Sequence, residues 1–263
     1  MQELPILSCV IGDEEIVTAE QFASHVPSEF KNVELVKSKN IKRCFMVFYD
    51  NPHKNKFLKK LKVVYRFHAG SVMTNVYLYR NTLIAIAPLG GPAAATLMEE
   101  LTIFSIEEFI AIGSAGCLDE SQKDKFVLVD RAIRDEGLSY HYLKPSTYVE
   151  TNGELTAKLE QYLKTNNLLY IKATTWTNDA FYRETKQKVE MAKGLGAVAV
   201  EMECSAWCAV AKLRKLKFAQ ILYFSDVVKQ ESWERTIKVK KGYNNSLRDL
   251  ILNLVKDMAD KLL

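Results

Sequence analysis

Residues 197–224 read AVAV-EMECSAWCAVAKLR-KLKFAQILYF and combine two apolar runs with a helical pattern between them. The runs at residues 197–200 and 218–224 are apolar without alternation, which predicts strands that are buried on both faces. Residues 203–214 between them predict a helix. A strand, a helix and a second strand in this order are typical of a mainly parallel sheet that helices cover on both faces.

The same alternation of strands and helices continues over most of the chain. Strands are predicted at residues 43–50, 72–79, 83–88, 109–112, 126–133 and 169–174, and helices at residues 54–61, 93–104, 153–165, 185–193 and 244–262. The strands at 72–79 and 83–88 are expected to form a hairpin. Gly113-Ser114-Ala115-Gly116 is predicted to be a loop between two strands. The fold class is therefore α/β in one domain over residues 41–263, and residues 1–40 are expected to be an N-terminal extension with little core of its own.

Composition limits the class of protein. Of the 263 residues 48% are hydrophobic, enough for a sizeable core, and the formal net charge of +4 is too small to indicate a nucleic-acid partner. No apolar stretch approaches the roughly 20 residues that span a bilayer, and the N-terminus lacks the pattern of a signal peptide. The five cysteines are scattered, so we expect reduced thiols in a cytoplasmic protein without a metal site or a membrane partner.

Glycine-rich candidates follow the predicted strands, and ligands of open α/β sheets bind beyond the carboxyl ends of the strands. Gly90-Gly91-Pro92 precedes a predicted helix, where it is either an anion site or a tight turn. The segment with Gly113 and Ser114 offers a hydroxyl and backbone amides to an anion or a sugar. Both signals are weak on spacing alone.

Three carboxylates also follow apolar runs. Glu201 and Glu203 come after residues 197–200, where burial costs free energy unless donors satisfy the carboxylates. A carboxylate accepts two hydrogen bonds at the spacing of vicinal sugar hydroxyls, but acids at a helix N-terminus are also favourable without a ligand. Asp226 after residues 218–224 is either a helix cap or a general acid at the edge of the sheet.

Aromatic, amide and charged side chains cluster in W-T-N-D-A-F-Y-R-E-T, residues 176–185, and such rings either stack on a base or fill a core. This segment resembles the purine and uridine phosphorylase family, which includes the methylthioadenosine/adenosylhomocysteine nucleosidases. So do R-D-E-G-L-S-Y-H-Y-L (134–143), G-S-A-G (113–116), V-E-M-E (200–203) and S-D (225–226). The similarity extends from residue 41 to the C-terminus. It implies a nucleoside phosphorylase-like catalytic domain, a single three-layer sandwich with a mixed, partly barrel-like sheet.

The resemblance also implies roles for individual residues. Those implied for the ribose are Met202 and Glu203, those for the base are Phe181 and Asp226, and those facing the nucleophile are Gly90, Gly91 and Ser114. Further substrate-binding residues that the resemblance implies are Glu201, Tyr182 and Gly113. The Glu203 carboxylate would bind the ribose hydroxyls, and Asp226 would protonate or hydrogen-bond a ring nitrogen of the leaving base. The resemblance implies no cofactor, inorganic phosphate as co-substrate, and a homo-oligomer such as a dimer or a hexamer.

The basic residues of the implied phosphate site differ from the family pattern. Ala111 stands where phosphorylases have an arginine ahead of the glycine–serine segment, and Lys54 stands where a second motif has another. Arg134 and Arg183 are candidates for the missing positive charge. We expect phosphorolysis of a purine nucleoside to the free base and ribose 1-phosphate. Hydrolysis, uridine phosphorolysis and a non-catalytic nucleoside-binding sensor are the alternatives, and the absence of the uracil-reading glutamine and arginine favours a purine.

Overall fold

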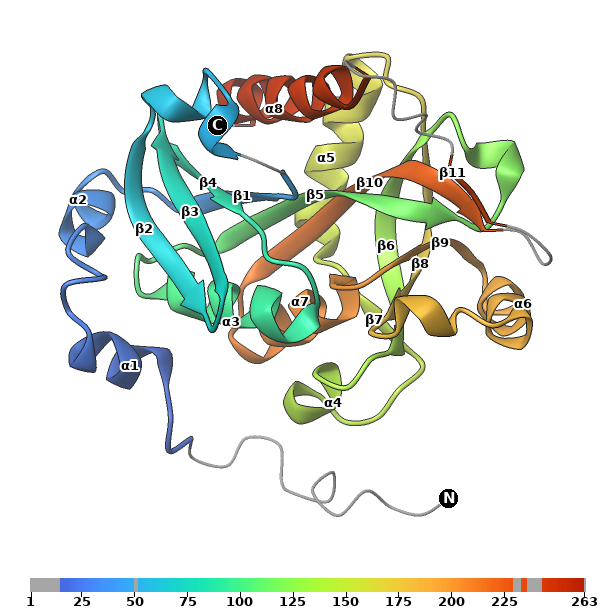
Figure 1. Ribbon diagram of the computed structural model, residues 1–263, viewed down its shortest axis with the longest axis horizontal. Coiled ribbons are helices and arrows are strands. Elements are labelled where there is room, and N and C mark those ends of the chain that lie inside the picture. Colours follow the sequence, from blue (N-terminus) through green and yellow to red (C-terminus); the bar gives the residue numbers. More distant parts are fainter. Residues whose placement is uncertain (1–14, 50–51, 229–232, 236–242, 263) are drawn as a thin grey trace.

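The structure is a computed structural model that describes residues 15–49, 52–228, 233–235 and 243–262. In this part of the chain, one sheet of 11 strands lies between layers of helices (Figure 1). The strands are β1 (Arg43–Val47), β2 (Lys62–Ala69), β3 (Val72–Tyr79), β4 (Thr82–Ile86), β5 (Glu108–Cys117), β6 (Phe126–Asp135), β7 (Tyr148–Glu150), β8 (Tyr170–Asn178), β9 (Ala197–Glu201), β10 (Lys217–Val228) and β11 (Trp233–Arg235). The α-helices are α1 (Ala19–His25), α2 (Val33–Ser38), α3 (Gly91–Thr102), α4 (Ser139–Tyr142), α5 (Gly153–Thr165), α6 (Lys186–Gly194), α7 (Cys204–Leu213) and α8 (Tyr243–Lys261). The 3-10 helices are η1 (Pro52–Lys54), η2 (Leu58–Lys60), η3 (Glu120–Gln122) and η4 (Phe181–Arg183). None of the described helices is long and apolar enough to cross a membrane.

Five of the strands close into a barrel. β10 pairs in parallel with β5 and antiparallel with β6, so the order β10-β6-β8-β9-β5 returns to β10. β1 continues the sheet from β5, and β4, β3 and β2 follow it to the far edge. The predicted α/β fold with a mixed, partly barrel-like sheet is therefore confirmed, including the hairpin between β3 and β4.

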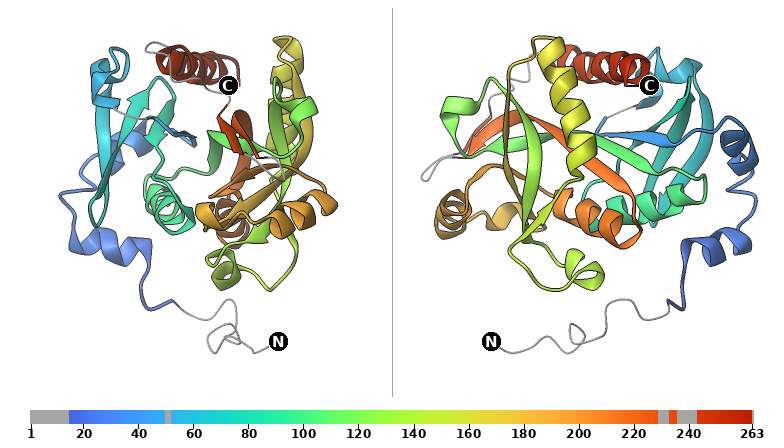
Figure 2. Two further views of the ribbon diagram at one scale, coloured as in Figure 1. Left: turned by 45° about the vertical axis from the view of Figure 1, so that its right-hand side comes forward. Right: turned by 180° about the vertical axis from the view of Figure 1, so that it is seen from behind.

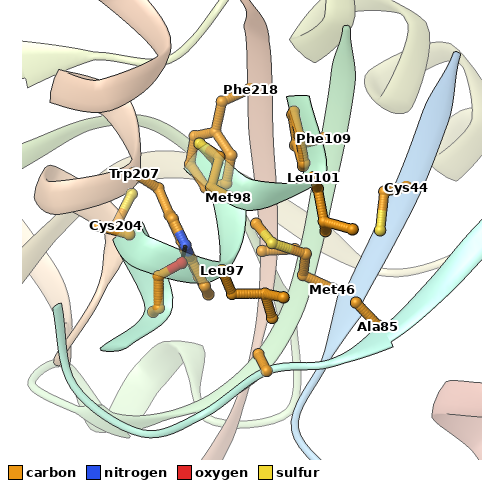
Figure 3. Packing of buried hydrophobic residues seen from close by; sticks show 14 of the residues in the cluster. Cys44, Met46, Ala85, Leu97, Met98, Leu101, Phe109, Cys204, Trp207 and Phe218 are labelled. Carbon is orange, nitrogen blue, oxygen red and sulfur yellow. Dashed lines mark hydrogen bonds between the residues drawn. The ribbon is translucent and has the colours of Figure 1, made fainter. Parts of the chain in front are cut away.

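Helices bury apolar side chains against both faces of the sheet. α5 and α8 lie on one face, where Leu159 and Val255 are fully buried (Figures 1 and 2). α3 and α7 lie on the other face, and Figure 3 shows Leu97, Trp207 and Phe218 among the side chains that fill it. The Trp207 indole N–H donates to the Ala94 carbonyl at 3.0 Å and so joins α7 to α3.

The loop predicted at residues 113–116 is wrong, because these residues continue strand β5. Glycine is needed there for close packing. A Cβ at Gly113 would lie 2.9 Å from Cδ2 of Phe48, and one at Gly116 would lie 2.8 Å from Cγ1 of Val200. Glycine within a strand often marks such a close approach, and its sequence pattern is the same as that of a turn.

The helix predicted over residues 54–61 is also wrong, because the 3-10 helices η1 and η2 occupy this region. The Asn55 side-chain oxygen accepts hydrogen bonds from the backbone N–H groups of Phe57 and Leu58, at 2.9 and 3.0 Å. An asparagine that binds the backbone two and three residues ahead closes a turn instead of extending a helix. Strand β2, which follows directly and forms an edge of the sheet, was not predicted.

The segment ahead of β1 joins the core through a few contacts. The Phe30 ring stacks on Tyr65 with centroids 4.9 Å apart, and Val36 of α2 is fully buried. The Asn32 side-chain amide donates to the Val64 carbonyl at 2.9 Å. Residues 1–14 lie outside the described part of the chain, and the division into an extension before residue 41 and one domain after it stays a prediction.

The buried Trp207 gives a test of this packing. Trp207→Ala removes an indole that is fully buried and hydrogen-bonded between α3 and α7, so we expect the free energy of unfolding to fall by about 3–5 kcal/mol. Urea unfolding followed by circular dichroism measures the change. Leu169→Ala at a 70% exposed position is the control and should change the free energy by less than about 0.5 kcal/mol. Equal effects of the two substitutions would contradict the core described above.

Candidate active site

A cavity of about 630 Å³ opens beyond β1, β4 and β9 and beside the second halves of β5 and β10. It is lined by Phe48, Tyr49, Ala87, Leu89, Ser114, Ala115, Gly116, Phe181, Tyr182, Glu184, Val200, Glu201, Met202, Glu203, Ser225 and Asp226. Seven of the residues that the sequence singles out therefore meet around one cavity, namely Ser114, Phe181, Tyr182, Glu201, Met202, Glu203 and Asp226. They come from segments that are far apart in the chain, and closure of the barrel brings them together.

Glu203 stands between β9 and α7 and contacts the N-terminus of another helix. Its Oε1 accepts a hydrogen bond from the Gly90 N–H at 2.6 Å, directly ahead of α3. Gly90 has φ 91°, a conformation that favours glycine, and a Cβ at Gly91 would lie 3.2 Å from Cβ of Ala206 in α7. The glycine pair does hold an acceptor at a helix N-terminus, and that acceptor is the protein's own Glu203 carboxyl group.

Glu201 is a buried cap of α7. Its Oε2 accepts hydrogen bonds from the backbone N–H groups of Glu203 and Cys204, at 2.8 and 2.7 Å. Its Oε1 accepts a third from the Thr177 hydroxyl at 2.6 Å. The alternative interpretation as an acid at a helix start therefore describes Glu201, although its side chain also reaches the cavity wall.

The two neighbouring glutamates both have raised pKa values. Burial, and secondly the nearby Glu201 carboxylate, raise the pKa of Glu203 from 4.5 to about 8. Burial also raises the pKa of Glu201, but its three donors oppose the shift and hold it at about 7. Burial therefore raises both pKa values, and the shift is opposed by three donors at Glu201 and by the Gly90 N–H at Glu203.

Asp226 lies inside β10 and not at its end, where the sequence suggested it. The pairing between β10 and β5 shifts register between Phe224 and Asp226, so Ser225 is an extra residue on the β10 side. Such a bulge re-aims side chains, and both Ser225 and Asp226 line the cavity. The Ser225 hydroxyl donates to Oδ1 of Asp226 at 2.6 Å.

Glu184 is a cavity residue that the sequence reasoning missed. It follows η4 and is half-buried, and burial together with the Asp226 carboxylate raises its pKa to about 7. The available signal was its position directly behind the aromatic pair Phe181 and Tyr182 in a segment that was already suspected.

The three basic candidates lie away from the lining of the cavity. Lys54 in η1 and Arg183 in η4 are exposed and are not among the lining residues. Arg134 is buried and binds the following loop, with hydrogen bonds from its guanidinium to the Ser139 hydroxyl and the Lys144 carbonyl, both at 2.8 Å. All charged side chains among the described lining residues are carboxylic acids.

Residues 43–256 match the sequence model of the Phosphorylase superfamily. The chain belongs to the phosphorylase superfamily. Its curated relatives include an uncharacterised protein of Acanthamoeba polyphaga mimivirus, 25% identical over 229 residues that cover 84% of this chain and 90% of the relative. A DeoD-type purine nucleoside phosphorylase of Mycoplasma genitalium is 26% identical over 214 residues, which cover 79% of this chain and 87% of that relative. The solved structure of the Helicobacter pylori nucleosidase MTAN has a TM-score of 0.65 at 16% identity and covers 84% of this chain and 99% of that one.

Membership of the phosphorylase superfamily confirms the resemblance that the sequence motifs indicated. As a superfamily member the chain is an enzyme that acts on nucleosides. The homo-oligomer that the resemblance implies stays a prediction.

The protonation of Glu203 can be tested through the pH dependence of stability. Its pKa in the folded protein, about 8, is above the ordinary value of 4.5, so the folded protein keeps a proton that the unfolded chain releases between these two values. The contribution of Glu203 to the free energy of unfolding is therefore complete below about pH 4.5 and is lost as the pH rises through 8. Glu203→Gln lacks this loss, so we expect its stability relative to wild type to increase from pH 5 to pH 8.5 in urea unfolding.

Glu190→Gln is the matched control, because it makes the same change at an exposed position of α6. Its stability should run parallel to that of wild type over this pH range. A Glu203→Gln curve that also stays parallel would contradict a raised pKa for Glu203.

Proposed function

We propose that this chain cleaves the N-glycosidic bond of a purine nucleoside with water as the nucleophile. In this proposal Glu203 binds the ribose hydroxyls and Asp226 binds the departing base. The observation that carries it is the single cavity lined by Glu203 at the end of β9, by Asp226 on the β10 bulge and by the aromatic pair of η4.

The chemistry of bond cleavage suits a cavity lined by carboxyl groups. As the bond between the sugar and the base breaks, its electron pair leaves with the base and positive charge develops on the ribose ring. Fixed carboxylates next to the ring stabilise that cation, as they do in glycoside hydrolysis. Asp226 takes up a proton from solvent and passes it to the departing base, while water adds its hydroxyl to the sugar carbon and releases its other proton to solvent.

Water is favoured over phosphate by the charge around the cavity. The Gly90 N–H, a candidate for phosphate, is occupied by Glu203, and the Arg134 guanidinium is occupied by the loop after β6. The charged groups among the described lining residues are all carboxyl groups, and each one that ionises repels a phosphate dianion, strongly where little water screens the charges. These contacts support hydrolysis and weaken the phosphorolysis that the sequence resemblance led us to expect.

Phosphorolysis is the second candidate, and the match to the Mycoplasma genitalium purine nucleoside phosphorylase over 87% of that relative favours it. A uridine-type reaction has less support. Thr185 and Gln187 stand at the positions where uridine-type enzymes carry the uracil-reading glutamine and arginine. Thr185 caps α6 by accepting a hydrogen bond from the Lys188 N–H, and Gln187 is exposed, so neither residue lines the cavity.

Incubation with single nucleosides separates the candidate reactions. We expect the purified chain to release base from adenosine, inosine or methylthioadenosine at the same rate with and without phosphate, and to leave uridine intact. Base release is measured by chromatography, and the sugar product is identified as ribose or as its 1-phosphate. Release that needs phosphate would establish phosphorolysis instead, and the absence of release from every nucleoside would refute the proposed function.

Substitutions at the two proposed catalytic groups give a second test. Glu203→Ala should lower kcat/KM at least about a hundredfold, and Asp226→Asn should lower it by a similar factor for purine nucleosides because it removes a proton donor to the base. Steady-state kinetics measures both. The exposed Glu190→Gln variant is the control for the amide change and should retain wild-type kcat/KM. Activity that survives both active-site substitutions would place the reaction elsewhere.

A further inference from the structure

Glu184 is a cavity group to which the mechanism above gives no task. It connects η4 to α6, so its position is fixed on one side by the turn at Phe181–Arg183 and on the other by the N-cap residue Thr185. Its carboxyl group lines the same cavity as Glu203 and Asp226. Among the described residues it takes part in no hydrogen bond or ion pair. A half-buried acceptor of this kind gains free energy when a ligand supplies a donor.

The position of Glu184 relates it to the base and not to the sugar. Glu184 directly follows η4, whose Phe181 and Tyr182 line the cavity, and the Asp226 carboxylate contributes to raising its pKa. Glu203 lies instead beside Glu201 and the Gly90 N–H at the start of α3. Two carboxyl groups that interact at the base end of the cavity can contact neighbouring atoms of one purine edge. On that edge, N7 lies beside the substituent at position 6, which is an amino donor in adenine and an oxo acceptor in guanine and hypoxanthine.

We propose that Glu184 reads the purine 6-substituent next to the atom that Asp226 binds, and that it selects 6-aminopurine nucleosides over 6-oxopurine nucleosides. This inference rests on the proposed function, which assigns the departing base to Asp226, and it adds that Asp226 contacts the base at N7. An ionised Glu184 accepts the amino N–H and repels the oxo oxygen. A site built to bind one hydrogen-bonding group rejects its analogue strongly, because the buried partner is then left without a hydrogen bond.

The selection depends on pH. Burial and the Asp226 carboxylate raise the pKa of Glu184 to about 7, so at lower pH the group carries a proton and can donate to a 6-oxo oxygen. The other ionisable groups that face this cavity are Tyr182 of η4, Glu201 and Glu203 beside α7 and Tyr49 beyond β1. The preference for the amino purine should therefore increase as the pH rises through about 7.

Binding of the free bases tests the inference without any need for catalysis. Dissociation constants of adenine and hypoxanthine are measured by titration calorimetry at pH 5.5 and pH 8 for wild type, Glu184→Gln and Glu184→Asp. We expect wild type to bind adenine at least about tenfold more tightly than hypoxanthine at pH 8, with a smaller ratio at pH 5.5. Glu184→Gln, whose amide both donates and accepts, should lose the pH dependence of this ratio. Glu184→Asp should keep the pH dependence and lower the ratio, because its carboxyl group is drawn back from the base.

The control is Glu190→Gln on the exposed side of α6, which should reproduce the wild-type ratios. A ratio that is unchanged in Glu184→Gln overturns the inference, and so does a wild type that binds neither base or binds hypoxanthine more tightly. If Glu184→Gln still cleaves nucleosides and its ratio of adenine to hypoxanthine binding is unchanged, only the role of Glu184 is overturned. The proposed function is judged separately, by base release from the nucleosides.

Discussion

The hydrogen bond from the Gly90 N–H to the Glu203 carboxylate holds together the part of the molecule on which the cavity depends. It joins the N-terminus of α3 to the start of α7, which follows strand β9 in the chain. The approach requires Gly90 with its positive φ and Gly91 against Ala206, and it buries a carboxyl group that has to be satisfied. A glycine pair, a helix end and a buried acid thus form one structural unit, although they lie about 110 residues apart in the sequence.

A second set of buried hydrogen bonds supports this unit. It runs through Glu201, Thr177, Ser205, Glu136, Ser139 and Arg134. These residues belong to β6, β8, β9, α4 and α7 and to the loop after β6. The network therefore fixes the first turn of α7 to β8, to β9 and to the segment that follows β6. Buried polar groups that are fully satisfied in this way make a site rigid, whereas a half-satisfied network destabilises it. This explains why the buried Arg134 is a structural residue: its donors hold the loop and Ser139, which in turn binds Glu136.

The sequence was informative where a residue type has one physical use and misleading where it has two. Carboxylates that follow a continuous apolar run need hydrogen-bond donors, so the sequence indicated Glu201, Glu203 and Asp226, which line the cavity. The alternation of predicted strands and helices indicated the α/β fold class. Glycine allows either a turn or close packing within a strand, and residues 113–116 were predicted as a turn although they belong to strand β5. Long charged side chains reach ligands only if the backbone directs them there. No pattern in the sequence showed that Lys54 would lie directly ahead of a turn closed by Asn55. Glu184 was missed because its place at the cavity depends on η4 and on strands that lie far apart in the chain.

The same carboxyl groups decide how strongly the cavity distinguishes the two charge states of a ligand. Among the described residues four acids line it, and burial together with repulsion from nearby acids raises the pKa of Glu184, Glu201 and Glu203 to between about 7 and 8. Near neutral pH these three groups therefore share fewer negative charges than three ordinary carboxylates would carry. A bound sugar that acquires positive charge lowers their pKa values, so the groups ionise as the cation develops and stabilise it more than they stabilise the neutral nucleoside. Binding that strengthens only as the bond breaks is what accelerates a reaction, and a phosphate anion in the same cavity would shift these pKa values in the opposite direction.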